Sequence, residues 1–279
     1  MSEGNHVLYL DHDGLRRRYV LHQPPGAPPS SGWPVVMMLD GRGGTPWTAI
    51  KSTGWTGQAD ARGFLALFPE AIRVNPNGPQ HFLDNPQLWR MDRAPLDDLG
   101  FLAAVLDDLP AHAPVDPSRV YVTGFSNGAA MCLRFAAAFP ERIAAIGPVA
   151  GYGPREETPL SRPVPACFLY GGRDPLGPAE GGALRMPWGE TIQRPPVREV
   201  VQRWARRCGA PVQPTRTQEV AGWRTEHHGE DLVLHIVAEL GHVWPGGHRL
   251  LPESLVGPGS DRLSATEVLW EFFDEHRLA

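Results

Sequence analysis

Short apolar runs of strand length recur along the chain, and helix-like segments separate them. The runs contain few alternating polar positions, which is typical of strands that are covered on both faces. Two further β-rich runs flank Asp13-Gly14, a dipeptide that favours a tight hairpin turn. We therefore predict eight strands that begin with an antiparallel hairpin. The six later runs occupy residues 35–39, 64–68, 120–124, 143–151, 166–172 and 232–237.

The intervening segments carry helix start and stop signals. Gly63 and Pro110 each follow a helix-like segment as stop signals, and Glu267 lies three positions after Ser264, which is a capping-box spacing. The alternation of strand and helix predicts a three-layer α/β fold, with a mostly parallel sheet and helices on both faces. The helices are expected over residues 53–62, 97–109, 127–138 and 197–208 and from residue 264 onward.

Length and composition fit a single large core. The chain has 279 residues, of which 42% are hydrophobic, so we expect one domain over residues 1–279. Residues 75–95 and 175–196 are rich in proline and glycine and fit no regular element. Long irregular segments of this kind are usually functional loops, so we expect them to shape a substrate cleft.

Charge and targeting signals narrow the partners. The net charge is −5 and Arg16 to Arg18 form the only tight basic cluster, which argues against nucleic-acid binding. No apolar run approaches the ~18 residues of a membrane span, so no membrane association is expected. The first residues lack signal-peptide features, which predicts a cytoplasmic protein, although a secreted protein whose leader has been removed would look the same. Oligomeric state stays open.

The three cysteines, Cys132, Cys167 and Cys208, are far apart and form no metal-ligand spacing. We expect them to be free thiols that are mostly buried.

Ser126 lies in the sequence GFSNG, between a strand-like run and a helix-like segment. This GxSxG context places a serine on a strained turn, where small flanking residues avoid collisions and the hydroxyl projects above the sheet. The following N–H, of Asn127, would begin a helix and could face a developing oxyanion. We therefore predict that Ser126 is a nucleophile.

A serine nucleophile needs a general base that is oriented by a carboxylate. Asp174 directly follows the strand-like run 166–172, at the end where sites cluster in such sheets. It is the predicted acid, with Glu180 and Glu190 as the alternatives, and an Asp-Pro turn as its non-catalytic interpretation.

His242 is the predicted base. It follows the last strand in the loop ELGHVWPGGH, and the preceding glycine gives its ring room to reach the serine. His248 is the alternative in the same loop, whereas His235 lies within the strand and is expected to be locked in the sheet. A metal pair of His242 and His248 would lack a third ligand, and no cofactor is expected.

A second oxyanion donor is expected in the loop VVMMLDGRGG, after the strand 35–39. The backbone N–H of Arg42 has the expected position, or that of Gly43 if the turn is shifted. The loop lacks the GxGxxG and Walker spacings of phosphate-binding loops.

Together these segments resemble the polyhydroxybutyrate-depolymerase-like esterases of the α/β-hydrolase fold, which are similar to feruloyl and acetylxylan esterases. The resemblance runs from about Pro34 to the C-terminus and rests on VDPSRVYVTGFSNGAAM, FPERIAAIGPVAG, YGGRDP and GHVWPGG. It implies a triad of Ser126, Asp174 and His242 and an oxyanion hole of the Arg42 and Asn127 N–H groups. It also implies that Trp89 and Trp244 line the substrate cleft, with core packing as their alternative.

The sequence departs from the family pattern at Asp40-Gly41, where His-Gly is usual. We expect the Asp40 carboxylate to turn away from the oxyanion and to be hydrogen-bonded beneath the loop. The cysteine pairs and leader of many secreted members are also missing, which argues against extracellular polymer degradation.

The sequence thus predicts a serine carboxylesterase that acts through an acyl-enzyme without a metal or cofactor. An acyltransferase or peptidase on the same scaffold, or a non-catalytic binding protein, are the alternatives. The choice of ester is expected to depend on the loops around Trp89, Trp188 and Trp244.

Overall fold

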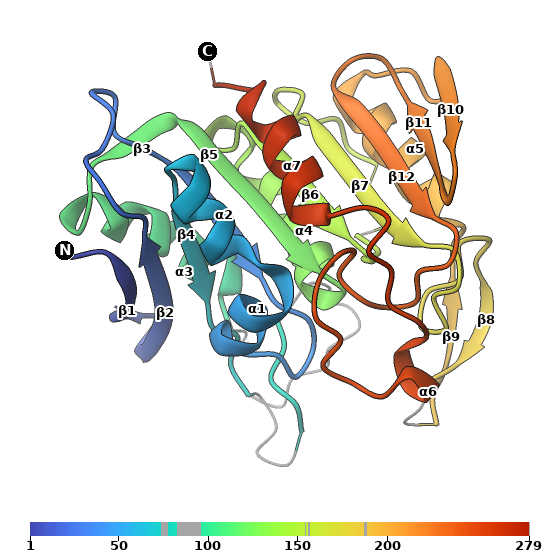
Figure 1. Ribbon diagram of the computed structural model, residues 1–279, viewed down its shortest axis with the longest axis horizontal. Helices are drawn as coiled ribbons and strands as arrows, with labels where there is room; N and C mark the ends of the chain where they lie inside the picture. Colours follow the sequence, from blue (N-terminus) through green and yellow to red (C-terminus); the bar gives the residue numbers. More distant parts are fainter. Residues whose placement is uncertain (74–77, 83–95, 154, 156, 187–188, 279) are drawn as a thin grey trace.

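Six parallel strands form the centre of a ten-stranded sheet, which two antiparallel hairpins extend at its edges (Figure 1). The computed structural model describes residues 1–279 except 74–77, 83–95, 154, 156, 187–188 and 279. In sheet order the strands are β1 (Gly4–His12), β2 (Leu15–Gln23), β4 (Leu65–Pro69), β3 (Trp33–Leu39), β5 (Val115–Phe125), β6 (Ala145–Val149), β7 (Ala166–Gly171), β12 (Leu232–Val237), β11 (Trp223–His227) and β10 (Arg216–Val220).

The central strands are the apolar runs of the sequence. Strands β3, β4, β6 and β7 are buried along their whole length, because helices cover both faces of the sheet. The parallel pairs are β3 with β4 and β5, β5 with β6, β6 with β7, and β7 with β12. Their carboxyl ends therefore share one edge of the sheet, which is the lower edge in Figure 1.

Helices form a layer on each side of this sheet (Figure 1). On one face lie α1 (Pro46–Thr53), α2 (Trp55–Arg62) and α7 (Ala265–Asp274), and their core includes the stacked rings of Trp55 and Phe273. On the other face lie α3 (Asp98–Asp108), α4 (Asn127–Ala138) and α5 (Val197–Cys208). Each large apolar side chain that is buried in these two layers stabilises the fold by about 1.5–3 kcal/mol relative to its exposed state. The remaining helical elements are α6 (Glu253–Val256) and the 3-10 turns Leu109–Ala111 and Pro140–Arg142.

The sheet has two strands more than the eight that the sequence predicts. The additional pair is the hairpin β10–β11, in which every residue of β10 is exposed. A strand without buried positions has no apolar signature, so the hydrophobic pattern could not reveal it. All eight predicted strands are present.

Two expected segments also differ in detail. The helix expected over residues 53–62 is α2, which begins at Trp55, whereas α1 before it was not expected. Gly54 adopts a left-handed conformation (φ 76°) that ends α1 and begins α2. Residues 175–196 are not wholly irregular, since β8 (Gly182–Arg185) and β9 (Thr191–Arg194) form a separate two-stranded sheet.

The three cysteines are free, with Cys132 and Cys167 buried and Cys208 half-buried, as expected. Within the described ranges, no helix is both long enough and apolar enough to cross a membrane.

Candidate active site

Ser126 occupies a sharp turn between β5 and α4. Its backbone has φ 54° and ψ −115°, a combination that residues with a side chain rarely adopt. A Cβ atom on Gly124 would lie 2.3 Å from the Gly128 carbonyl oxygen, and one on Gly128 would lie 2.0 Å from the Leu39 carbonyl oxygen. The two glycines therefore let α4 begin directly against the end of β3, which brings Ser126 beside the loop that follows β3.

Asp174 and His242 form a close pair at the same edge of the sheet. Asp174 follows β7, His242 follows β12, and the Asp174 Oδ2 atom lies 2.6 Å from His242 Nδ1. The Asp174 side chain is 1% exposed, and its Oδ1 atom accepts hydrogen bonds from the N–H groups of Leu176 and Gly177 at 2.7 and 2.8 Å. The carboxylate is thus held in place by three hydrogen-bond contacts. An ionised carboxylate only accepts hydrogen bonds, so the contact favours the tautomer with the proton on Nδ1 and a free lone pair on Nε2.

The His242 ring approaches the turn that contains Ser126 through its contact with Phe125. The two ring centroids are 4.9 Å apart, and Phe125 immediately precedes Ser126. In the described part of the chain, no hydrogen bond joins the Ser126 hydroxyl to His242. Catalytic hydrogen bonds are often long without substrate and tighten when it binds.

The alternative acids and bases lie elsewhere. His248 and Glu190 are exposed, and Glu180 is an exposed partner of Arg198.

His235 lies within β12 and is hydrogen-bonded to Thr225 at 2.9 Å, as expected for a histidine locked in the sheet. Burial, with a smaller contribution from the charge of His227, lowers the pKa of His235 to about 4.

The glycine-rich loop after β3 contacts the turn that contains Phe125 and Ser126. A Cβ atom on Gly41 would lie 3.4 Å from the Ser126 Cβ atom and 3.3 Å from the Phe125 ring, so the Gly41 backbone is close to the Ser126 turn. The Gly43 N–H donates to the Gln80 carbonyl at 2.7 Å, and the Gly44 N–H donates to the Gly41 carbonyl at 3.0 Å. The Gly43 amide, the alternative oxyanion donor, is therefore engaged within the loop region.

The Asp40 carboxylate is hydrogen-bonded within its own loop, as expected. It accepts from the Gly41 N–H at 2.7 Å and from the Thr48 hydroxyl at 2.6 Å. Burial raises the pKa of Asp40, and hydrogen bonds from Thr48, Gly41 and Thr45 partly offset this effect. The carboxylate thus serves to fix the start of the loop and of α1.

The expected cleft tryptophans have different outcomes. Trp89 and Trp188 lie outside the described residues. Trp244 is 3% exposed and donates its indole N–H to Thr266 at 3.0 Å. It packs edge-on against Phe125 and Trp55, so the expectation that it lines an open cleft is corrected in favour of core packing.

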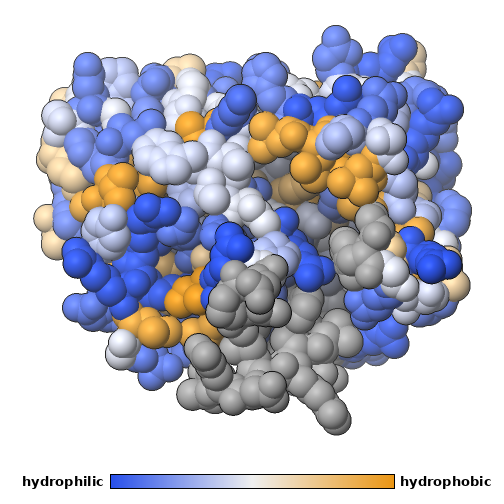
Figure 2. Space-filling view, turned by 90° about the horizontal axis from the view of Figure 1, so that it is seen from below, coloured by the Kyte–Doolittle hydropathy of each residue, from blue (hydrophilic) through white to orange (hydrophobic). Residues whose placement is uncertain are grey.

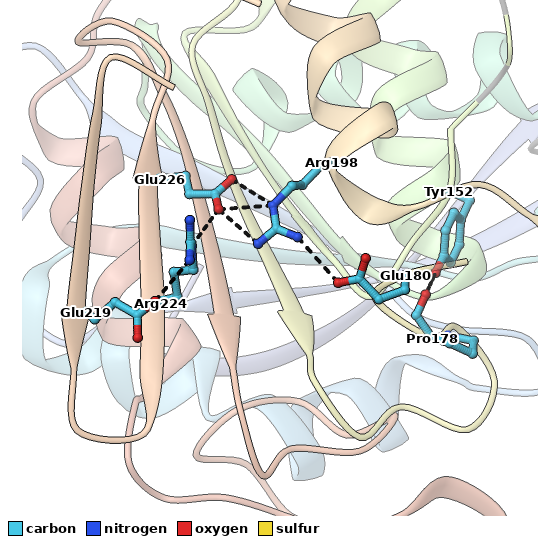
Figure 3. A network of polar contacts seen from close by, with 7 residues as sticks. All are labelled: Tyr152, Pro178, Glu180, Arg198, Glu219, Arg224 and Glu226. Carbon is cyan, nitrogen blue, oxygen red and sulfur yellow. Dashed lines mark hydrogen bonds and ion pairs between the residues drawn. The ribbon is translucent and has the colours of Figure 1, made fainter. Parts of the chain in front are cut away.

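The segment after Asp174 is anchored on both sides. The Tyr152 hydroxyl donates to the Pro178 carbonyl, and Glu180 pairs with Arg198 (Figure 3). Arg198 also donates to the buried carboxylate of Glu226, which accepts a further bond from Arg224. This network connects α5 and the β10–β11 hairpin to the loop that follows Asp174.

Three residues near the site had not been expected from the sequence. Phe125 contacts His242, Gln80 bonds to the loop after β3, and the backbone of Phe82 is bonded by the Asn127 side chain. Gln80 and Phe82 lie in the segment 75–95 that was expected to be irregular, where no periodic pattern indicates which residues turn inward.

Figure 2 shows the molecule from the side of the carboxyl ends of the strands, where apolar side chains gather in patches around a hollow. Trp47 of α1 and Leu250 and Leu251 of the loop after His242 are large apolar side chains that remain exposed, at 46%, 44% and 52%. Among the described residues, no cluster of metal-ligating side chains was found.

Comparison with known proteins assigns the family. The model of the dienelactone hydrolase family matches residues 20–185, which span β2 to β8 and include Ser126 and Asp174. The chain belongs to the dienelactone hydrolase family. Members of this family are hydrolases of the esterase type, and the sheet with its helical layers is the α/β-hydrolase fold, as the sequence predicts.

Two relatives agree with this assignment. NocK of Nocardia uniformis subsp. tsuyamanensis, which is named as an esterase, is 30% identical over 93% of this chain and 79% of its own length. Poly(3-hydroxyalkanoate) depolymerase C of Paucimonas lemoignei is 30% identical, over 47% of this chain and 30% of its own. The second match confirms the resemblance to depolymerases that the motifs indicate.

A solved structure supports the fold of this dienelactone hydrolase family member. The acetyl xylan esterase from Aspergillus awamori superposes with a TM-score of 0.61, over 81% of this chain and 89% of that chain. Its sequence identity is 16%, so the likeness concerns the fold alone.

Proposed function

We propose that this protein is a serine carboxylesterase in which Ser126 is the nucleophile, His242 the general base and Asp174 the residue that orients the base. The observation that carries the proposal is the 2.6 Å contact between His242 Nδ1 and a buried Asp174 carboxylate, at the strand ends beside Ser126. That arrangement sets the tautomer in which Nε2 can accept a proton.

The reaction would proceed in two halves. Ser126 Oγ attacks the ester carbonyl carbon while its proton passes to His242 Nε2, and the carbonyl electron pair moves onto oxygen. As this tetrahedral adduct collapses, the bond to the alcohol oxygen breaks and His242 returns the proton to the leaving alkoxide. Water then attacks the acyl-enzyme with the same proton transfers and releases the acid.

The oxyanion of each adduct would be held by the backbone N–H groups of Arg42 and Asn127. Asn127 is the first residue of α4, where the amides are not used within the helix and the helix dipole favours negative charge. Arg42 directly follows Gly41, whose backbone lies against Ser126. Two preorganised donors at this point supply most of the electrostatic stabilisation that acyl transfer requires.

The exposed apolar side chains and the relatives support a proposal for the substrate class. Trp47, Leu250 and Leu251 offer apolar contact surface, and the net charge of −5 disfavours a strongly anionic substrate. The named relatives include a poly(3-hydroxyalkanoate) depolymerase and a bifunctional acetylxylan esterase/xylanase of Neocallimastix patriciarum, which is 24% identical over 60% of this chain and 22% of its own length. We propose that the substrates are esters with a small acyl group or a hydroxyalkanoate unit. A panel of esters in which the acid and the alcohol are varied separately would identify the best substrate.

Ser126→Ala tests the proposal. This variant should lose hydrolysis of p-nitrophenyl acetate and butyrate by at least ~10³-fold, because the attacking oxygen is gone. It should also lose covalent labelling by a fluorophosphonate probe, which is read by intact-protein mass spectrometry.

His248→Ala is the matched control for His242→Ala. His248 is exposed and lies in the same loop, so its removal should leave turnover within about twofold, whereas removal of His242 should abolish it. Persistent labelling of Ser126→Ala, or equal effects of the two histidine variants, would refute the assignment.

A further inference from the structure

A short segment after β4, residues 80–82, contacts the loop after β3 and the start of α4, which carry the two proposed oxyanion donors. Gln80 makes two bonds to the loop after β3: its carbonyl accepts from the Gly43 N–H at 2.7 Å, and its Nε2 donates to the Gly44 carbonyl at 2.5 Å. Two positions later, the Phe82 N–H donates to the Asn127 Oδ1 atom at 2.9 Å, and Asn127 Nδ2 donates to the Phe82 carbonyl at 3.1 Å.

The Asn127 side chain is therefore a structural clamp. Its carboxamide oxygen accepts from the Phe82 N–H, and its carboxamide nitrogen donates to the Phe82 carbonyl. These two bonds fix the orientation of the side-chain amide. The Phe82 ring is 1% exposed and belongs to the core that packs beneath α3 and α4. The segment is thus anchored in the interior and reaches outward to the two loops.

The loop after β3 is held at two points with Arg42 between them. Asp40 fixes the first point through Gly41 and Thr48, and Gln80 fixes the second through Gly43 and Gly44. Gly43 has φ 82°, and glycine-rich backbone is free to move unless such contacts restrain it. The direction of the Arg42 peptide therefore depends on both anchors.

An oxyanion hole works only if its two N–H groups point at one oxygen from about 3 Å. We propose that residues 80–82 form an oxyanion clasp, which sets the spacing between the Arg42 and Asn127 amides, with Gln80 and the Asn127 side chain as positioning residues. This inference rests on the proposed function, because it concerns the same site.

Gln80→Met tests the clasp. Methionine keeps the length of the side chain but removes the bond to Gly44, while the backbone bond to Gly43 remains. We expect kcat for p-nitrophenyl butyrate to fall about ten- to a hundredfold, since a shift of about 1 Å in a catalytic group has effects of this size. KM should stay within about threefold, because the oxyanion forms only after binding.

A tetrahedral inhibitor gives a readout that a purely structural role would not move. An alkyl trifluoromethyl ketone forms an oxyanion adduct with an active-site serine, so its Ki should rise by the same factor by which kcat/KM falls. Gln218→Met is the matched control, since Gln218 is exposed on β10, and it should change neither value. Circular dichroism and the unfolding midpoint check that each variant is folded.

Gln80→Glu is the second variant, and it serves if Gln80→Met does not fold. A carboxylate oxygen would face the Gly44 carbonyl in place of the amide nitrogen, so the same loss of kcat and of inhibitor affinity is expected. Wild-type kcat and Ki in a folded Gln80 variant, or a loss that appears in KM alone, would overturn the clasp. If the Gln80 variants give either of these results and Ser126→Ala is inactive, the clasp is refuted and the esterase assignment stands. If Ser126→Ala remains active, the esterase assignment itself is refuted.

Discussion

The backbone of Ser126 carries strain that its neighbours maintain. Its φ of 54° is combined with a ψ of −115°, while its N–H donates to the Val149 carbonyl and its own carbonyl accepts from the Ala130 N–H. Such a conformation costs on the order of 1–3 kcal/mol and persists only where surrounding contacts impose it. The turn that exposes the hydroxyl therefore lowers the stability of the folded chain.

Ser126→Gly and Ser126→Ala separate this strain from chemistry. Both variants lack the nucleophile, but glycine tolerates positive φ and alanine does not. We expect the glycine variant to have a free energy of unfolding about 1 kcal/mol higher than the alanine variant, as measured by urea denaturation.

The same pair at Ser161, which is exposed and has no positive φ, should give the opposite order, because glycine there only adds freedom to the unfolded chain. An alanine variant at Ser126 that is as stable as the glycine variant would contradict the assignment of strain.

At the scale of elements, the position of Ser126 depends on how closely α4 approaches β3. A methyl group on Gly128 would overlap the backbone of Leu39 and Asp40 at 2.0 to 2.6 Å, and backbone cannot move aside as a flexible side chain can. The contact thus fixes the register of helix against strand and, with it, the distance from Ser126 to the oxyanion loop.

Gly128→Ala should lower the free energy of unfolding by more than about 3 kcal/mol and abolish activity, because the helix must shift. Gly57→Ala is the matched control, since Gly57 is an exposed residue of α2 with no atom within 4 Å of the new methyl group. Alanine there should stabilise the protein by about 0.5–1 kcal/mol. Similar melting temperatures for the two variants would refute the close-approach argument.

The sequence predicts the elements that are buried and misses those that are not. Strand β12 and helices α4 and α5 have the expected bounds, and the other central strands overlap their expected runs, because burial imposes an apolar pattern on them. The largest difference is β5, which begins at Val115, five residues before the expected run. The exposed β10 has no such pattern, and the break at Gly54 depends on one left-handed residue. In each case the missing information is a backbone geometry or a tertiary contact.

The candidate site follows the same division. Ser126, Asp174 and His242 can be proposed from the sequence, because a serine-hydrolase triad requires those residue types at strand ends. The clasp cannot, since the Gln80 and Asn127 side chains bond to backbone groups of Gly44 and Phe82, and no sequence pattern indicates which backbone groups lie beside them. Trp244 has the composition of a cleft residue, and only its burial and its bond to Thr266 show that it packs in the core.

At the scale of the whole molecule, the Glu226 network joins the added hairpin to the rest of the fold. Glu226 is 2% exposed, and Arg198 and Arg224 donate to its carboxylate at 3.0 and 2.7 Å. Burial alone would raise the pKa of Glu226, but the hydrogen bonds and charges of the two arginines outweigh it and lower the pKa below its ordinary 4.5.

This direction fixes the pH dependence of stability. Because the pKa is lower in the folded state, the interaction is fully stabilising above about pH 4.5 and is lost as the pH falls through the folded-state pKa. Glu226→Gln should lower the free energy of unfolding at pH 7 by about 1–3 kcal/mol and flatten its decline below pH 4.5, as measured by urea denaturation from pH 3 to 7.

Glu230→Gln, at an exposed glutamate four residues further on, should leave the profile as in the wild type. A Glu226→Gln profile that runs parallel to the wild type in acid would show that the arginines do not stabilise the charged carboxylate.

The burial of the thiols has a consequence for redox surroundings. All three cysteines are free, and burial raises the pKa of each, which suppresses the thiolate that reacts with oxidants and disulfides. The fold is instead held together by its two apolar layers, with no covalent cross-link to make or break. No disulfide therefore has to form or stay intact for this fold, so its assembly does not depend on the redox potential of its surroundings.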